Sequence, residues 1–167
     1  MTAVAAVREG RWQITAAHFS VPIDDERAFA SSWPIPIALP ARTPTDPEEI
    51  VNLIPITAQD HFPVPFSDRK DALLIGTSLR EWIVGGGRIA QFTHQGQPGV
   101  IAVSRLGNPI AGVIPTANLA WAAWNGSLTV PHENRRVSLP VRVLSVFLRN
   151  QTGWEKVQEH VSLAVTE

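Results

Sequence analysis

The chain of 167 residues contains no cysteine and no tyrosine, and neither basic nor acidic residues are in excess. The absence of cysteine excludes a disulfide framework and thiolate chemistry. Fourteen basic and 15 acidic residues create no overall field that would attract nucleic acid or an anionic membrane. No apolar run reaches the roughly 18 residues of a transmembrane helix. We therefore expect neither a nucleic-acid partner nor a membrane partner.

The N-terminal apolar run meets Arg8 and Glu9 too early for a signal peptide, so we expect a cytoplasmic protein. The histidines lie at least 28 residues apart, which excludes a local zinc motif. The stretch Gly85 to Ala90 fits a dinucleotide-binding pattern, but no carboxylate follows about 20 residues later to bind the ribose. We expect no metal and no cofactor.

What the chain does contain is core-forming material, with 44% hydrophobic residues, six tryptophans and six phenylalanines. Its length suits one well-packed domain and is too short for two ordinary ones. Three segments differ in composition and residue pattern. Residues 1–23 alternate like a β-hairpin, 24–66 form a proline-rich linker or wrap with one short helix signal near 46–60, and 67–167 form the domain proper.

Within the domain the pattern predicts a short strand at 71–77 and a helix-turn-helix piece at 78–95, broken by three glycines. Four strand-like runs follow at 99–106, 118–130, 136–149 and 153–165, separated by turn residues. An antiparallel meander preceded by helical material belongs to the α+β class.

One motif occurs twice, because Trp12, His18 and Ser20 have the same spacing as Trp154, His160 and Ser162. Either the two amphipathic strands resemble each other by chance, or the chain carries two copies of the same closing segment.

Strand periodicity selects the candidate site residues. It predicts that Trp154, Lys156, Gln158, His160 and Ser162 share one face of their strand, opposite Val157, Val161 and Leu163. It also places Arg142 on a face that is otherwise aliphatic, and Trp121 together with Asn125, opposite Trp124.

The chemistry of these side chains allows a site. His160 has a pKa range that suits a general base, and Arg142 could hold a carbonyl or carboxylate with its paired donors. The plainer alternative is that His160 is a hydrogen-bonded structural histidine and that Arg142 pairs with Glu155 or Glu159.

The last third, NLAWAAWNGSLTV and RVSLPVRVLSVFLRNQTGWEKVQEHVS, resembles the closing strands of the nuclear transport factor two-like superfamily, especially its SnoaL-like and ketosteroid-isomerase-like bacterial members. The shared features are an Ala-Trp strand, an LPxR strand with an aliphatic run and Arg, a Gly-Trp turn and His-x-Ser. The stretch DALLIGTSLREWIVGGGRI resembles the family's entry strand and the approach to its next helix. The likeness covers roughly residues 67 to 166.

This resemblance implies a cone-like (cystatin-like) fold, in which a curved antiparallel sheet packs against helices and folds its concave face over a pocket. His160 and Arg142 become candidate catalytic residues, and Trp121, Asn125 and Trp154 candidate ligand-binding residues. Asp71, Glu81 and His61 are spare candidates, although Asp71 and Glu81 could equally flank or cap a helix. The steroid-isomerase mechanism of the family needs a Tyr, which this chain lacks. GRWQITAAHFSVPIDDE also resembles the end of such a domain, as if a truncated first copy preceded the second.

Two functions follow from the resemblance. The first is a small-molecule-binding protein or a cofactor-free enzyme of isomerase, cyclase or dehydratase type that acts on an apolar carbonyl compound. The second is a non-catalytic dimerisation or interaction module without a working active site. We expect a homodimer under either function, because Val143 and Phe147 on a convex face would otherwise lie in water.

Overall fold

The computed structural model describes residues 1–20, 26, 28, 47–54, 57–59, 64–78, 81–94 and 102–164. Most of the proline-rich segment, including the spare candidate His61, lies outside the described residues. Within them, no helix has both the length and the apolar character needed to cross a membrane.

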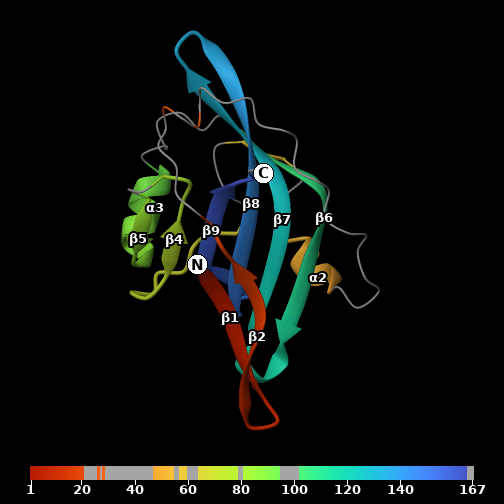
Figure 1. Ribbon diagram of the computed structural model, residues 1–167. Coiled ribbons are helices and arrows are strands. Elements are labelled where there is room, and N and C mark those ends of the chain that lie inside the picture. Colours follow the sequence, from red (N-terminus) through yellow and green to blue (C-terminus); the bar gives the residue numbers. More distant parts are fainter. Residues whose placement is uncertain are drawn as a thin grey trace.

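The chain folds into a large curved sheet with short helices, which confirms the predicted α+β class (Figure 1). Seven strands lie in the order β3-β6-β7-β8-β9-β4-β5. Their bounds are β3 Thr57–Gln59, β4 Leu73–Ile75, β5 Trp82–Val84, β6 Ala102–Ile114, β7 Leu119–His132, β8 Arg135–Arg149 and β9 Trp154–Leu163. The pairs along the long strands are antiparallel, whereas β4 joins β9 in parallel.

Strand β6 continues through a stretch predicted to be a turn. Gly107, Asn108 and Pro109 lie inside β6, where the register with β7 shifts between Leu106 and Ile110. Gly107 has a φ of 75°, a conformation that glycine adopts without strain. The turn chemistry of this stretch therefore makes an irregularity within one strand instead of separating two strands.

The helix-turn-helix expected at 78–95 is wrong in its first half, because residues 82–84 form strand β5. Ile83 is buried between two exposed neighbours, and β5 pairs antiparallel with β4. Gly85, with a φ of 96°, ends the strand, and one helix, α3 (Gly86–His94), follows it. Leu74, Ile83 and Ile89 pack together in a small cluster that ties these elements to the sheet edge.

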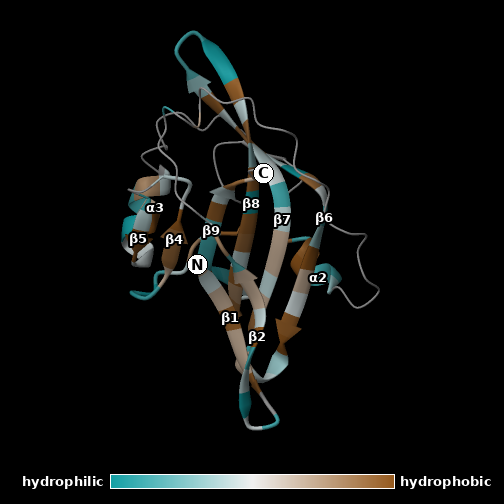
Figure 2. Cartoon of the chain, in the orientation of Figure 1, coloured by the Kyte–Doolittle hydropathy of each residue, from teal (hydrophilic) through white to brown (hydrophobic). Residues whose placement is uncertain are grey.

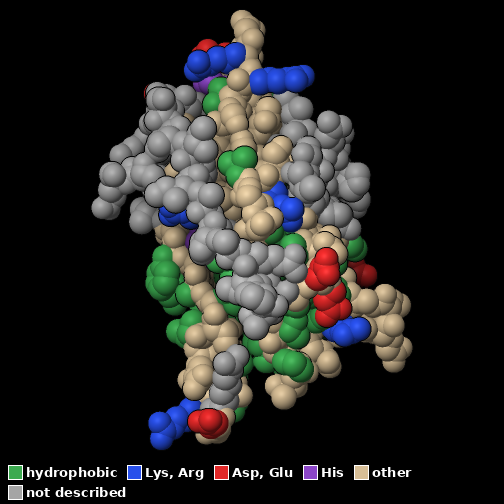
Figure 3. Space-filling model, turned by 90° about the vertical axis from the view of Figure 1, so that its right-hand side faces the viewer, with side chains coloured by type: hydrophobic (Ala, Val, Ile, Leu, Met, Phe, Trp, Pro, Cys, Tyr) green, Lys and Arg blue, Asp and Glu red, His purple; other side chains and the backbone are tan. Residues whose placement is uncertain are grey.

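The N-terminal hairpin is confirmed as β1 (Thr2–Arg8) and β2 (Arg11–His18). Glu9 and Gly10 both have positive φ, 52° and 74°, as a tight two-residue hairpin turn requires. Figure 2 shows hydrophilic residues at this turn and at the opposite tip, where β7 meets β8. Figure 3 shows charged side chains gathered at the same two ends of the molecule. The apolar residues of the strands lie between these tips.

Two layers cover opposite faces of the β6 to β9 region (Figure 1). On one face, here called the α2 face, helix α2 (Glu48–Val51) contributes Ile50, Val51 and the following Ile54 to the main core. A guanidinium nitrogen of Arg105 on β6 donates to the backbone oxygen of Ile54, 3.1 Å away, and anchors the end of this turn. On the other face, the hairpin face, β1 and β2 pack against the sheet.

The expectation that Val143 and Phe147 lie in water is wrong, since their exposed fractions are 3% and 0%. Both belong to the main core on the α2 face, together with Trp124 and Val161. The predicted homodimer therefore loses the argument on which it rested.

Replacing Phe147 with alanine should lower the free energy of unfolding by about 3–5 kcal/mol, because it removes a fully buried ring from the core. Urea denaturation measures the change. Trp12→Ala is the matched control: the Trp12 side chain is 77% exposed, and its loss should change stability by about 0.5 kcal/mol or less. Equal losses in the two variants would contradict the core described above.

Candidate functional site

A β-bulge in strand β9 decides which side chains lie on which face of the sheet. Val146 pairs with Gln158, but the next residue, Phe147, pairs with Lys156, so that Val157 is an extra residue. The predicted alternation along β9 is therefore wrong across the bulge. Gln158, His160 and Ser162 share the hairpin face as predicted, whereas Trp154 and Lys156 lie on the α2 face.

The bulge brings Lys156 and Glu159 to the same face, although residues three positions apart in a regular strand lie on opposite faces. Their side chains form an ion pair of 2.7 Å between Nζ and Oε2, with 4% and 1% of the side chains exposed. Ser145 on the neighbouring strand β8 donates its hydroxyl to the same Glu159 oxygen, at 2.8 Å. Two opposite charges thus lie buried beside the apolar core, where each is stabilised chiefly by the other.

Three buried polar atoms on the α2 face have no hydrogen-bond partner among the described residues: Glu159 Oε1, Trp124 Nε1 and Trp154 Nε1. Both tryptophans pack in the core on the α2 face, and Ser145, the partner of Glu159, lies between Val143 and Phe147 of that core. A buried polar group without a partner costs about 1–3 kcal/mol. One acceptor and two donors are therefore available on one apolar face.

Cation–aromatic contacts flank this polar group. The Lys156 ammonium lies 5.1 Å from the ring centre of Phe66, and the Arg149 guanidinium lies 5.5 Å from that of Trp154. Backbone hydrogen bonds hold the segment around Phe66 against β9, from Ser67 to the Lys156 carbonyl and from Lys156 to the Pro65 carbonyl. The Phe66 ring thus contacts the buried Lys156 cation, whereas the Trp154 ring contacts the exposed Arg149.

On the hairpin face, His160 is hydrogen-bonded through both ring nitrogens. The hydroxyl of Thr2 lies 2.9 Å from Nδ1, and the hydroxyl of Ser20 lies 2.7 Å from Nε2. His18 stacks on it with ring centres 3.9 Å apart, and its own Nε2 lies 2.7 Å from the hydroxyl of Ser162. This environment matches the structural alternative for His160, since hydroxyl groups satisfy both nitrogens of a neutral imidazole.

Both imidazoles are held in the neutral form. Burial, as the largest cause, lowers the pKa of His18 to about 4 together with the nearby His160 and the positive charge of Arg142. Burial is also the main cause that lowers the pKa of His160 to about 4. A charged imidazole at either position would lose its hydration and face a stacked neighbour, so the neutral pair is strongly preferred.

The other predicted site residues divide between the faces. Trp121, Asn125 and Arg142 lie on the hairpin face with His160, as the resemblance implied, and Trp121 and Asn125 share that face as the periodicity predicted. The ring of Trp121 lies across Gly112, where an added Cβ would come within 2.8 Å of the ring. Asn125 is buried and Arg142 is exposed. Trp154 lies on the opposite face, so the five residues do not converge on one site.

The spare candidates that the structure describes have local partners. Asp71 forms an exposed ion pair with Arg69, and the hydrogen bond from Arg69 lowers the pKa of the Asp71 carboxyl. Glu81 accepts a hydrogen bond from the backbone N–H of Ser78. Glu159 pairs with Lys156 on the α2 face, whereas Arg142 lies on the hairpin face, so the ion pair between Arg142 and Glu159 that the sequence allowed does not form.

Sequence reasoning missed the contacts that join Ser145, Lys156 and Glu159, and the position of Trp124 on the same face. The available signal was a lysine and a glutamate in a strand that pairs with an almost wholly aliphatic neighbour. Regular alternation places these two residues on opposite faces, and only the bulge reverses this.

The sequence matches no family model and no curated protein. Solved structures with the nuclear transport factor 2 fold are similar to this chain. A superfamily protein from Salmonella enterica serovar Typhimurium has a TM-score of 0.52 and 18% identity, covering 61% of this chain and 74% of that one. A family member from Cytophaga hutchinsonii has a TM-score of 0.47 and 16% identity, covering 60% of this chain and 77% of that one. A protein with a cystatin-like fold from Novosphingobium aromaticivorans has a TM-score of 0.43 and 17% identity, covering 57% and 63%. The similarity to the Salmonella protein confirms the expected cone-like fold.

Replacing Lys156 with methionine should destabilise the protein by about 3–5 kcal/mol, because the Glu159 carboxylate would stay buried without its cation. Adding Glu159→Leu to this variant should recover part of the loss, since no buried charge remains. The exposed Arg69–Asp71 pair provides the control: Arg69→Met should leave the stability almost unchanged, because solvent screens this pair. Denaturant titration of the four proteins measures these changes, and equal costs for Lys156→Met and Arg69→Met would contradict a buried pair.

The stacked imidazoles predict a pH dependence. Their folded pKa of about 4 lies below the ordinary value of 6.5, so the unfolded chain binds more protons between these values. Their contribution to stability should be complete above pH 6.5 and fall as the pH decreases to 4. The stability difference between the wild type and His160→Gln should shrink over this window. NMR titration of the imidazole protons provides a direct check, and midpoints near 6.5 would contradict the buried arrangement.

Proposed function

We propose that the protein binds a small, mostly apolar molecule that carries a carbonyl and a hydroxyl group, and that the ligand lies on the α2 face. The observation that supports the proposal is the set of buried atoms without partners on this face, Trp124 Nε1, Trp154 Nε1 and Glu159 Oε1. An indole N–H donates to a carbonyl oxygen, and a carboxylate oxygen accepts from a hydroxyl group. Apolar surroundings with a few placed polar groups are typical of small-molecule sites.

The same residues support turnover of isomerase, cyclase or dehydratase type. Ser145 and Lys156 hold one oxygen of Glu159, which orients the carboxylate and leaves its other oxygen to accept a proton from an acidic C–H or O–H group. The Lys156 ammonium would stabilise the negative charge that develops on a neighbouring carbonyl oxygen. The roles predicted for His160 and Arg142 concern the hairpin face, and they stay predictions beside this assignment.

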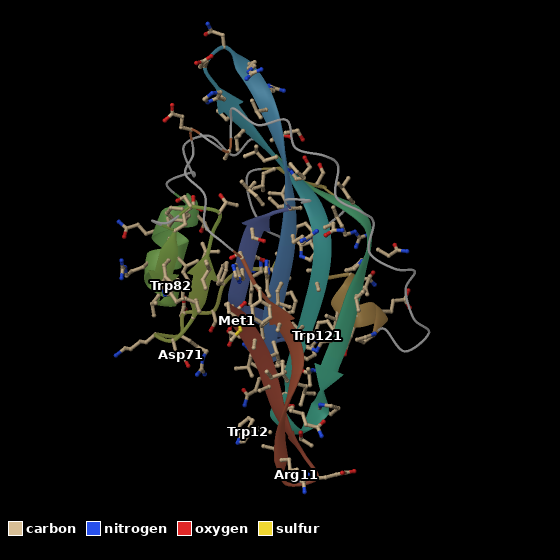
Figure 4. The ribbon with its side chains drawn as sticks, viewed as in Figure 1. Met1, Arg11, Trp12, Asp71, Trp82 and Trp121 are labelled. Atoms are coloured by element: carbon tan, nitrogen blue, oxygen red, sulfur yellow. The ribbon has the colours of Figure 1, made fainter. Side chains whose placement is uncertain are left out.

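A second candidate function is protein interaction without catalysis. The outward side of the hairpin carries apolar residues in water, with exposed fractions of 53% for Val7, 77% for Trp12 and 68% for Ile14. Figure 4 shows Trp12 near the projecting end of the hairpin, away from Trp121. Exposed apolar clusters of this kind are typical of interaction surfaces.

Thermal unfolding across a panel of cyclic hydroxy-ketones, with the parent hydrocarbons as matched controls, tests the first proposal. A ligand at 100 times its Kd adds about 2.7 kcal/mol, which raises the Tm by several degrees in a chain of this size. We expect shifts from hydroxy-ketones and none from the hydrocarbons. Trp154→Phe and Trp124→Phe keep a ring but remove the N–H donor, so each should weaken binding about 2-fold to 10-fold. Trp82→Phe on the exposed strand β5 should leave binding unchanged.

Variants of the two faces locate the ligand. Loss of the shift in Glu159→Gln, with binding retained in His160→Ala and Arg142→Ala, would support the α2 face. The reverse pattern would overturn this placement and support the predicted His160 site. A panel without any shift would favour the interaction module.

A further inference from the structure

The N-terminal hairpin and the end of the β8–β9 hairpin have the same register. Trp12, His18 and Ser20 each precede their counterparts Trp154, His160 and Ser162 by 142 residues. Cross-strand pairs follow the same offset: Val7 pairs with Trp12 as Arg149 pairs with Trp154, and Thr2 pairs with His18 as Leu144 pairs with His160.

The β-bulge also recurs at the equivalent position. In β2 the pairing skips Thr15, because Val4 pairs with Ala16 and Ala5 with Ile14. In β9 it skips Val157, which follows Thr15 by the same 142 residues. A chance likeness of two amphipathic strands does not require the same extra residue at the same place, because alternation alone produces no bulge.

These two equivalent units contact each other through equivalent residues. His18 bonds to Ser162 and His160 bonds to Ser20, both at 2.7 Å, and the two imidazoles stack with an interplanar angle of 18°. Val4 and Val146, which are also equivalent, are both buried in the apolar cluster between the hairpin and the sheet. The contacts are reciprocal: the histidine of each unit bonds to the serine of the other unit, as equivalent residues do in the two-fold interface of a homodimer.

We propose that the hairpin face of the sheet is a homotypic docking surface, which recognises residues 144–162 of a second copy of this chain. In a single chain, β1 and β2 occupy this surface in place of the second copy. The chain is therefore a monomer while its hairpin is closed. Displacing the hairpin frees Trp121, Val146 and Val157 to pack against the same face of another copy. This inference rests on the pairing of the two hairpins and is independent of any ligand on the α2 face.

One contact explains why the internal hairpin is preferred over a second copy. The Thr2 hydroxyl bonds to Nδ1 of His160, but the residue equivalent to Thr2 in the β8–β9 unit is Leu144. A second copy would leave that buried nitrogen without its hydroxyl partner, and such a loss is costly. The internal hairpin also needs no association of two molecules.

Sedimentation velocity of full-length variants over a wide concentration range tests the proposal. The wild type should sediment as a monomer. Val4→Asp places a charge on the buried inner side of the hairpin, and we expect a defined dimer. Val7→Asp is the matched control on the exposed outer side of the same strand and should stay monomeric. Val4→Asp combined with Trp121→Glu should return to a monomer, because the docking face then carries a charge as well.

Circular dichroism establishes that each variant is folded. Where Val4→Asp unfolds the chain, His18→Ala combined with Ser20→Ala removes both exchanged hydrogen bonds without adding a charge, and a dimer is again expected. A folded monomer from this loosened hairpin would overturn the proposal. A wild-type dimer, or a dimer that Trp121→Glu does not abolish, would also overturn it.

Discussion

The single extra residue in strand β9 is the constraint on which the rest of this structure depends. Without the bulge at Val157, Lys156 and Glu159 would lie on opposite faces, and no ion pair could form between them. The same bulge separates Trp154 from His160, so that one lies on the α2 face and the other beneath the hairpin. One backbone irregularity thus divides the polar residues of one strand into two groups with different partners.

Both faces of the central strands are covered, and each cover includes polar groups that the apolar layers alone would not satisfy. On the hairpin face, hydroxyl groups complete the hydrogen bonds of both histidines, and the result is a neutral, closed interface. On the α2 face, one carboxylate oxygen of Glu159 pairs with Lys156, but the other oxygen, Oε1, has no hydrogen-bond partner in the part of the chain described. Two indole N–H groups on this face have none there either. A satisfied network holds a structure together, whereas each unsatisfied group in a buried network costs stability.

Much of the fold could be predicted from the sequence because strands and tight turns have local signals. Turn residues and alternation located the N-terminal hairpin and three of the long strands, β7 to β9, but only the first part of β6; the closing motifs indicated the cone-like fold. Strand β5 was missed, since three residues beside a run of glycines carry too little periodicity to separate strand from helix. The candidate site could be predicted only in part: Trp121, Asn125, Arg142 and His160 share a face, but the hairpin that covers His160 comes from the other end of the chain.

The sequence by itself determined the amphipathic strands, the repeated Trp-His-Ser spacing and the absence of cysteine chemistry, because these depend on residue identity and short-range spacing. Only the tertiary structure decided which face each polar residue occupies and which partner it meets. The physical reason is the period of two in a β-strand: one unpaired residue, set by the register with a neighbouring strand, turns the side chains beyond it to the other face. That register depends on packing between residues distant in sequence, which local pattern does not contain.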